Sequence, residues 1–311
     1  MIATRRNLFL AAQWLFAAAI VWAAVRSLRG QWSAATQRLS TISIGWTWIV
    51  GATVIVFLTY LLLIETWRRL LTGWNAFLPF GVASRIWFVS NLGKYLPGKI
   101  WSIAAMSVMA RERGVSPVAA AGSSVIIQVI TIATGIALVA VTGMKAIDQP
   151  VLAIAIAVIL MVSLALLPII LPRLGAIAAS LTGKEITIPP LRSSVIWLAV
   201  ARSLLSWIAY GVAFKMFVIA ILGSASGATF SYIAVYAASY IIGFLALFAP
   251  GGVVVRESAL VAGMVRLGLA NQPDAFAVAV ASRLWLTVVE LVPGFIALGF
   301  ARRSSNTQLT Q

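Results

Sequence analysis

Long apolar stretches, each long enough to cross a lipid bilayer, constrain the fold of this chain more than any other feature. A helix of about 20 apolar residues spans a hydrocarbon core of about 30 Å. Hydrophobic residues make up 62% of the 311 residues and charged residues 10%, which is more apolar surface than a soluble core can bury. The sequence therefore predicts an all-α polytopic membrane protein, with one transmembrane domain over residues 1–311. Six full spans are predicted, at Leu8–Val25, Trp46–Leu71, Pro117–Thr142, Val151–Leu171, Val195–Leu222 and Asp274–Phe300.

The first of these stretches follows Arg5 and Arg6 and resembles a secretory signal in its charge and its small residues. It is longer than the apolar region of an ordinary signal, and further spans follow it. We therefore expect a retained first helix.

Two further apolar stretches are interrupted by proline and glycine. Gly81–Arg113 is broken at Leu96-Pro97-Gly98-Lys99, and Phe230–Arg266 is broken at Ala249-Pro250-Gly251-Gly252. Proline removes a backbone donor and glycine loosens the chain, so each break ends one helix and begins another. Each arm has roughly 15 to 20 residues, which is marginal for a crossing. We expect re-entrant helical hairpins, which would make eight spans if counted as crossing; ordinary turns between helices are the alternative.

The two Pro-Gly breaks also indicate an internal duplication. They lie 153 positions apart, close to half of the chain, and Trp46 and Trp197 open comparable apolar spans upstream of them. We infer two repeats of about 155 residues, in the halves 1–150 and 151–311. Three spans and one hairpin give each half an odd number of crossings, so the second half is inverted relative to the first. Inverted repeats with discontinuous helices are typical of secondary transporters, whose sites lie at the repeat interface near the midplane.

The basic residues predict the orientation. Most of the Arg and Lys residues near span ends, including Arg68, Arg69, Arg111 and Arg173, fall on the same side as both termini. The positive-inside rule places that side in the cytoplasm, which predicts a multi-pass protein of the cell inner membrane with both termini cytoplasmic. The first hairpin then enters from the cytoplasmic face and the second from the opposite face.

Charged and polar groups inside apolar segments are the candidates for function, because a charge in hydrocarbon is costly. Lys94 and Lys99 flank the first break, and the Arg256-Glu257 pair follows the second. The helices that begin after the breaks would add positive dipole ends and free backbone donors, which suit a phosphate. The candidate substrate-binding set comprises Lys94, Pro97, Gly98, Lys99, Gln128, Pro250, Gly251, Gly252, Arg256, Glu257, Arg283 and Glu290.

Structural interpretations of the same residues stay open. The two lysines can extend to the interface, and Arg256 can pair with Glu257. Arg283 and Glu290 lie seven residues apart on one face of the last span, so they can pair with each other or, across helices, with Glu257 and Arg256. Gln128 can simply bond a neighbouring helix.

Composition excludes several kinds of chemistry. The chain contains no Cys and no His, so disulfides, thiolate nucleophiles, imidazole bases and the usual soft metal sites are absent. Only seven acidic residues occur, and they form no cluster in the sequence. The net charge of +16 sits beside apolar helices, which indicates anionic lipid surfaces and not nucleic acid. We expect no catalytic residue, metal or cofactor.

Three motifs resemble a known family. They are Asn-Leu-Gly-Lys-Tyr-Leu-Pro-Gly-Lys-Ile-Trp from Asn91, Ala-Arg-Glu-Arg-Gly-Val-Ser from Ala110, and Pro-Gly-Gly-Val-Val-Val-Arg-Glu-Ser-Ala-Leu from Pro250. Over nearly the whole chain, the sequence resembles the flippase-like family related to the transmembrane region of lysylphosphatidylglycerol synthase. Two positions depart from the pattern: Gln128 stands where the family often has Glu, and Ser258 where Gly is common. The first departure puts an acidic or proton-coupled role of that position in doubt.

The resemblance implies an inner-membrane protein that translocates aminoacylated phospholipids or polyprenyl-linked glycans, often beside envelope glycosyltransferases. It does not imply aminoacyl transfer, because no counterpart of the soluble synthase domain follows Phe300. The leading hypothesis is translocation of the head group of an anionic phospholipid or polyprenyl-phosphate-linked glycan, without enzymatic activity. The alternatives are a membrane-embedded glycosyl- or phosphotransferase acting on a lipid carrier, which would need Glu65, Glu257 and Glu290 to converge, and a non-catalytic scaffold for envelope-lipid enzymes.

Overall fold

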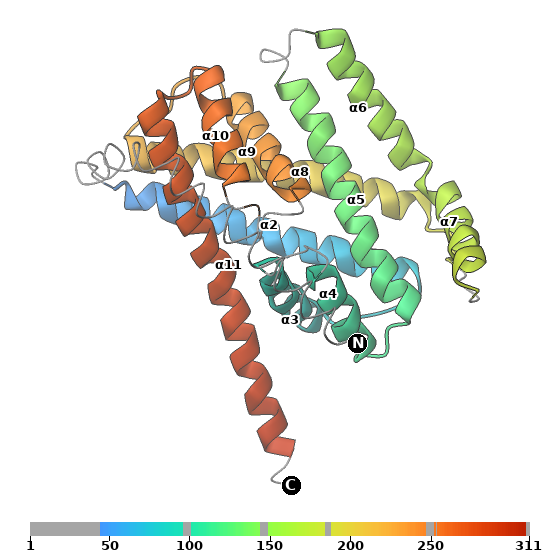
Figure 1. Ribbon diagram of the computed structural model, residues 1–311. Helices are drawn as coiled ribbons and strands as arrows, with labels where there is room; N and C mark the ends of the chain where they lie inside the picture. Colours follow the sequence, from blue (N-terminus) through green and yellow to red (C-terminus); the bar gives the residue numbers. More distant parts are fainter. Residues whose placement is uncertain are drawn as a thin grey trace, which may run out of the picture.

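Four helices of the computed structural model are long and apolar enough to cross a bilayer, counted over the residues that it describes. These residues are 44–95, 101–143, 149–183, 188–246, 252 and 254–308, and no β-strand occurs among them. Each of the four helices agrees with a predicted span to within a few residues, whereas the predicted first span lies outside the described residues. The four helices are α2 (Trp46–Gly73), α5 (Pro117–Thr142), α8 (Ser193–Leu222) and the Gln272–Ala297 part of α11 (Gln272–Gln308) (Figure 1).

The predicted span Val151–Leu171 is bent and not continuous. The structure forms α6 (Pro150–Ala165) and α7 (Leu167–Thr182), which meet at an angle of 67°. Pro168 lies in the first turn of α7. It has no backbone N–H to donate to the last turn of α6, and its ring would clash with a carbonyl group of that turn if the helix continued straight. The described part of the chain therefore has four spans, or five if the bent pair crosses as one.

Both predicted breaks separate two helices. The first lies between α3 (Phe80–Asn91), extended by the 3-10 turn Leu92–Tyr95, and α4 (Trp101–Arg111). The second lies between α9 (Thr229–Leu245) and α10 (Val255–Arg266). In each hairpin the two arms pack against each other. Helices α3, α4 and α10 have 12, 11 and 12 residues, or about 16–18 Å each, whereas α9 has 17 residues, or about 25 Å.

The long helices and the hairpins pack in a reciprocal way. Helix α2 lies along α8, while α5 packs against α9 and α11 packs against α3. Thus each hairpin is covered by a long helix that follows the other hairpin in the chain. Close approach depends on glycine: a Cβ at Gly294 of α11 would lie 2.8 Å from Leu92 Cδ2, and one at Gly211 of α8 would lie 2.4 Å from Ile233 Cγ1 of α9.

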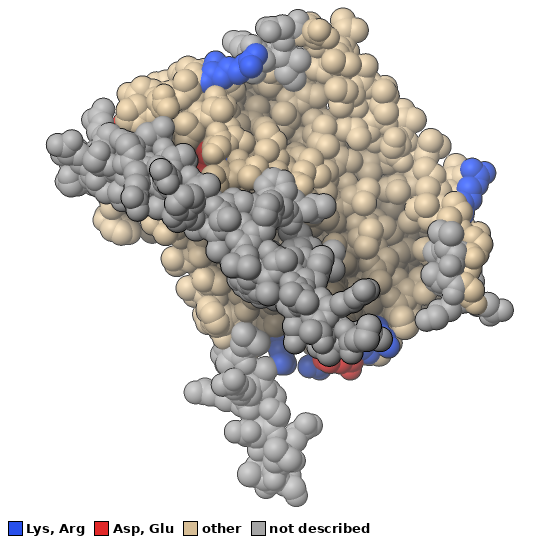
Figure 2. Space-filling view, viewed as in Figure 1, with Lys and Arg blue, Asp and Glu red and all other residues tan. Residues whose placement is uncertain are grey.

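The surface is that of a protein surrounded by lipid. On the face shown in Figure 2, the described Lys and Arg side chains lie at the edges, and the described surface between them, drawn in tan, is almost wholly uncharged. Many large apolar side chains are exposed, among them Val151, Ile159 and Leu284. Such a surface would be costly in water but is favourable in a hydrocarbon core.

Candidate functional site

Residues on both sides of both breaks line a single cavity. Asn91 ends α3 and Ser102 is the second residue of α4, while Gly243 lies near the end of α9 and Arg256 in the first turn of α10. Further polar groups of the wall come from Gln128 of α5, from Tyr236 and Tyr240 of α9, and from Arg283, Thr287 and Glu290 of α11. This cavity, here called the hairpin cavity, has a volume of about 840 Å³ including its open mouth. The two hairpins, distant in sequence, thus contribute to one site.

Arg256 is the most deeply buried charge that lines the hairpin cavity. Its side chain is 6% exposed, and the guanidinium carbon lies 5.6 Å from the centre of the Tyr236 ring. Among the described residues, its Nε and Nη2 atoms have no hydrogen-bond partner although both are buried. Buried polar groups are nearly always hydrogen-bonded, and unpaired ones are costly. Two unused donors of a buried cation therefore point to an anionic ligand.

Glu257 does not serve as the counter-ion that its position next to Arg256 suggests. Its Oε2 accepts a hydrogen bond of 2.6 Å from the backbone N–H of Val254, and its Oε1 lies 3.6 Å from Nη1 of Arg283. The pairing across helices is therefore confirmed for Glu257 and Arg283. Glu257 lies behind the cavity wall, where it holds the start of α10 and positions Arg283.

The backbone at the start of α10 is strained. Val254 has φ = 73°, a conformation that β-branched residues rarely adopt, and Gly252 has φ = 67°. A backbone of this kind costs about 1–3 kcal/mol and is typical of functional sites. The hydrogen bond from the Val254 N–H to the Glu257 carboxylate holds this conformation. Glu257 is the third residue of α10, and a Glu at that position can accept from the N–H of the residue just before the helix.

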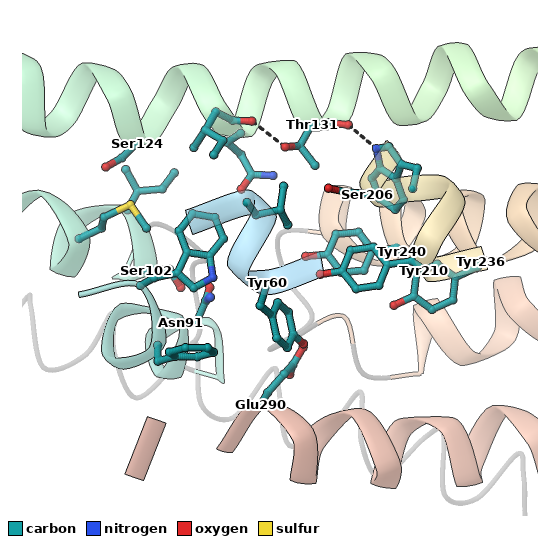
Figure 3. A pocket seen from close by; sticks show the side chains of 18 residues that line it. Tyr60, Asn91, Ser102, Ser124, Thr131, Ser206, Tyr210, Tyr236, Tyr240 and Glu290 are labelled. Atoms are coloured by element: carbon teal, nitrogen blue, oxygen red, sulfur yellow. Dashed lines mark hydrogen bonds between the residues drawn. The ribbon is translucent and has the colours of Figure 1, made fainter. Parts of the chain in front are cut away.

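An aromatic cavity of about 1060 Å³ adjoins the hairpin cavity and shares seven of its lining residues, including Gln128 and Glu290. Figure 3 shows tyrosines of three helices, Tyr60, Tyr210, Tyr236 and Tyr240, on one side of it. Tyr210 stacks on Tyr236 at 5.6 Å, and the Tyr60 hydroxyl donates to Glu290 Oε1 at 3.2 Å. The amide and hydroxyl groups of the wall make this cavity polar as well as aromatic.

Sequence reasoning did not identify the tyrosines. Tyr236 and Tyr240 lie four residues apart in an apolar helix, so they share one face. That spacing was the available signal, because buried tyrosines in the middle of apolar helices are not interface markers.

The structure brings together Gln128, Arg256, Arg283 and Glu290 of the predicted set as cavity-lining residues. Gly252 lies against α9, where a Cβ would be 2.6 Å from the Gly243 carbonyl oxygen. Lys94 belongs to the 3-10 turn after α3, and its side chain lies outside the described part of the chain. The rest of the predicted set also falls outside the described residues: Pro97, Gly98, Lys99, Pro250 and Gly251.

The acidic residues that the enzyme alternative requires are not gathered in the described residues. On α2, the Glu65 carboxylate is paired with two arginines: its Oε2 lies 2.6 Å from Arg68 Nε, and its Oε1 lies 2.6 Å from Arg69 Nε. Within the described ranges, no group of three acidic side chains is placed to hold a metal ion. Of the two carboxylates of the site, Glu257 contacts Arg283, and Glu290 accepts a hydrogen bond from Tyr60.

The helices and the two cavities define a multi-pass α-helical membrane protein with a charged and aromatic site between two helical hairpins. The chain belongs to the family described as the lysylphosphatidylglycerol synthase TM region, whose model matches residues 9–294. This confirms the resemblance seen in the motifs and is consistent with a role connected with membrane lipids. A comparison with curated proteins finds no match.

Proposed function

We propose that this protein translocates the head group of an anionic lipid, a phospholipid or a polyprenyl-phosphate-linked glycan, across the inner membrane without covalent chemistry. The observation that carries the proposal is the buried guanidinium of Arg256, which lines a cavity and leaves two donors unused. A phosphate oxygen accepts hydrogen bonds from a guanidinium in favourable geometry. Moving a phosphate through hydrocarbon unaided is prohibitive, and a polar cavity lowers that barrier.

The packing supports an architecture of two inverted repeats. Each half supplies a long helix, a hairpin and a second long helix, in the orders α2, α3–α4, α5 and α8, α9–α10, α11. The contacts are reciprocal, because α5 covers the hairpin of the second half and α11 that of the first. Helices α3, α4 and α10, at about 18 Å or less, and α9, at about 25 Å, are all shorter than a hydrocarbon core of about 30 Å, which favours re-entrant hairpins that reach the cavity from opposite faces. Small relative movements of the halves would then expose the site to either side.

The other charges of the site serve the same cycle. The Glu257–Arg283 pair balances one cation, so the charge at Arg256 remains available for the substrate. Glu290, bonded to Tyr60, stands at the boundary of the two cavities. We expect these groups to stabilise the cavity or to exchange partners when access switches, since each state must satisfy its buried charges.

The proposal is tested with the purified protein in liposomes that contain a trace of fluorescent phosphatidylglycerol. A membrane-impermeant reductant quenches the outer leaflet, and the rate at which the inner-leaflet signal becomes accessible reports translocation. Vesicles with the protein are expected to lose the protected signal faster than empty vesicles. A fluorescent polyprenyl-phosphate sugar is the second probe, and acceleration of neither probe would contradict the proposal.

Gly243 allows α10 to bring Arg256 close to α9, since a Cβ there would lie 2.7 Å from Arg256 Cβ. Gly243→Ala is therefore expected to displace Arg256 and to slow translocation by roughly tenfold, the factor that corresponds to about 1.4 kcal/mol. The measurement is the liposome assay together with thermal unfolding in detergent. Gly263→Ala, at the same pair of helices but against Val235 at 3.1 Å, is the control and should stay nearer to the wild-type rate.

A further inference from the structure

An apolar groove runs between α2, α3 and α11 on the outer surface of the protein. We call it the lateral groove; its volume is about 1540 Å³ including the open side. Val54 and Phe57 of α2 form one wall, and Val288, Val292 and Ile296 of α11 form the other. All five side chains are exposed, so in a bilayer this groove faces the acyl chains of the lipids.

The α3 wall of the lateral groove carries polar atoms that have no hydrogen-bond partner among the described residues. They are Arg85 Nε and Ser84 Oγ, both buried. The other polar residue of the groove, Thr53, is already used: its hydroxyl donates to the Ile49 carbonyl at 2.8 Å and accepts from Trp285 Nε1 at 2.9 Å. A long apolar groove with an arginine and an unpaired serine hydroxyl on one wall matches an amphipathic anion.

Phe88 separates the lateral groove from the aromatic cavity. Its side chain lines both spaces and is 9% exposed. It stacks on Phe57 of the groove at 6.2 Å and meets the ring of Tyr60, which lines the aromatic cavity, edge-on at 6.0 Å. The Tyr60 hydroxyl in turn donates a hydrogen bond to Glu290. One aromatic side chain thus forms a partition between the lipid-facing surface and the polar site.

We propose that the lateral groove binds an anionic phospholipid, with an acyl chain along α2 and α11 and its phosphate at Arg85 and Ser84. Phe88 is the partition that the head group passes on its way to Arg256. The binding step stands on the groove alone, whereas the passage step rests on the proposed translocation. A phosphate suits Arg85, because a guanidinium can hold it by two parallel hydrogen bonds. An apolar chain suits the exposed valines, which otherwise face mobile lipid.

The binding step is tested by photocrosslinking in liposomes with a phosphatidylglycerol that carries a diazirine at the middle of one acyl chain. Diacylglycerol with the same chain is the comparison probe, since it lacks the phosphate. Peptide mapping is expected to find the phosphatidylglycerol label on α2 and α11 at Val54, Val288 and Val292, well above the diacylglycerol label. Arg85→Gln is expected to lower the phosphatidylglycerol label roughly tenfold and to leave the diacylglycerol label unchanged.

Filling the groove provides a second variant that keeps Arg85. Val292→Trp places a large ring in the groove, whereas Phe295→Trp changes a residue of similar exposure on the same helix that does not line it. The first variant is expected to lose the groove label and to slow translocation, and the second to keep both. Equal labelling by the two probes, or equal labelling in the two tryptophan variants, would mean ordinary surrounding lipid and would overturn the binding step.

The groove and the proposed function fail in different ways. If the label depends on Arg85 and is lost in Val292→Trp, but the protein accelerates no probe in the liposome assay, the groove stands and the translocation proposal falls. If Val292→Trp and Phe88→Leu both translocate fluorescent phosphatidylglycerol at the wild-type rate, the passage through the groove is overturned while translocation stands. A changed rate in Phe88→Leu with an unchanged groove label supports Phe88 as the partition.

Discussion

Arg256→Ala is expected to abolish translocation of anionic lipid probes in the liposome assay. Hydrogen bonds to a charged group contribute about 1.5–3 kcal/mol each, so the loss of two donors is expected to slow translocation roughly 100-fold or more. Neutral probes should be affected far less, because they do not use the guanidinium. The ratio of the two rates therefore reports the loss of phosphate recognition and not merely a loss of protein.

Two further variants separate the charge of Arg256 from its geometry and from general basicity. Arg256→Lys keeps the charge but not the planar set of donors, so an intermediate rate is expected. Arg266→Ala removes an exposed arginine from the other end of the same helix and should leave the rate near the wild type. Thermal unfolding of Arg256→Ala in detergent checks that the fold survives. A folded Arg256→Ala protein with the full rate for phosphatidylglycerol would contradict the role of Arg256.

Gly211→Ala is expected to have the largest effect on stability. The new Cβ would lie 2.4 Å from Ile233 Cγ1 and 2.5 Å from the backbone Cα of Ile233, so no side-chain rotation relieves the clash. Helices α8 and α9 would have to separate, and overpacking of this kind costs about 1–3 kcal/mol or more. The expected result is a clear fall in the thermal unfolding temperature in detergent and a lower yield of monodisperse protein.

Gly81→Ala is the matched control for that experiment. Gly81 also lies in a helix, but nothing stands within 4 Å of its Cβ position. Alanine is the better helix former by roughly 0.5–1 kcal/mol, so this variant should unfold at the same temperature as the wild type or slightly higher. Equal unfolding temperatures for the two variants would show that the α8–α9 contact is not close at Gly211.

Much of the helical architecture could be predicted from the sequence, because apolar length and Pro-Gly breaks are local signals. Pro168 shows the limit: it was counted as one more residue of an apolar stretch, although a proline in that position bends the chain by 67°. Apolar length measures transfer to lipid, whereas a bend depends on backbone hydrogen bonds. The span count therefore needed the structure.

The sequence identifies the charged residues that line the cavity but leaves several pairings open, and the structure shows the one between Glu257 and Arg283. Arg256 and Glu257 are neighbours in sequence, yet adjacent residues on a helix point about 100° apart and do not face each other. Arg256 consequently faces Tyr236, while Glu257 reaches Arg283 on another helix. Long-range packing decides such partners, and no periodicity in one helix contains that information. The lateral groove depends on three helices and was equally out of reach.

The reciprocal packing of α5 on α9 and of α11 on α3 has a consequence for how such a chain can change over time. Taken alone, residues 1–150 or residues 151–311 would leave the hairpin of that half partly uncovered, because a helix of the other half packs on it. We therefore expect a substitution in one of these helices to be tolerated only if it is compatible with the helix of the other half that it contacts. The same constraint acts on the two subunits of an obligate dimer. We therefore expect the cavity residues to vary independently in the two halves, and the residues of the α5–α9 and α11–α3 contacts to vary together.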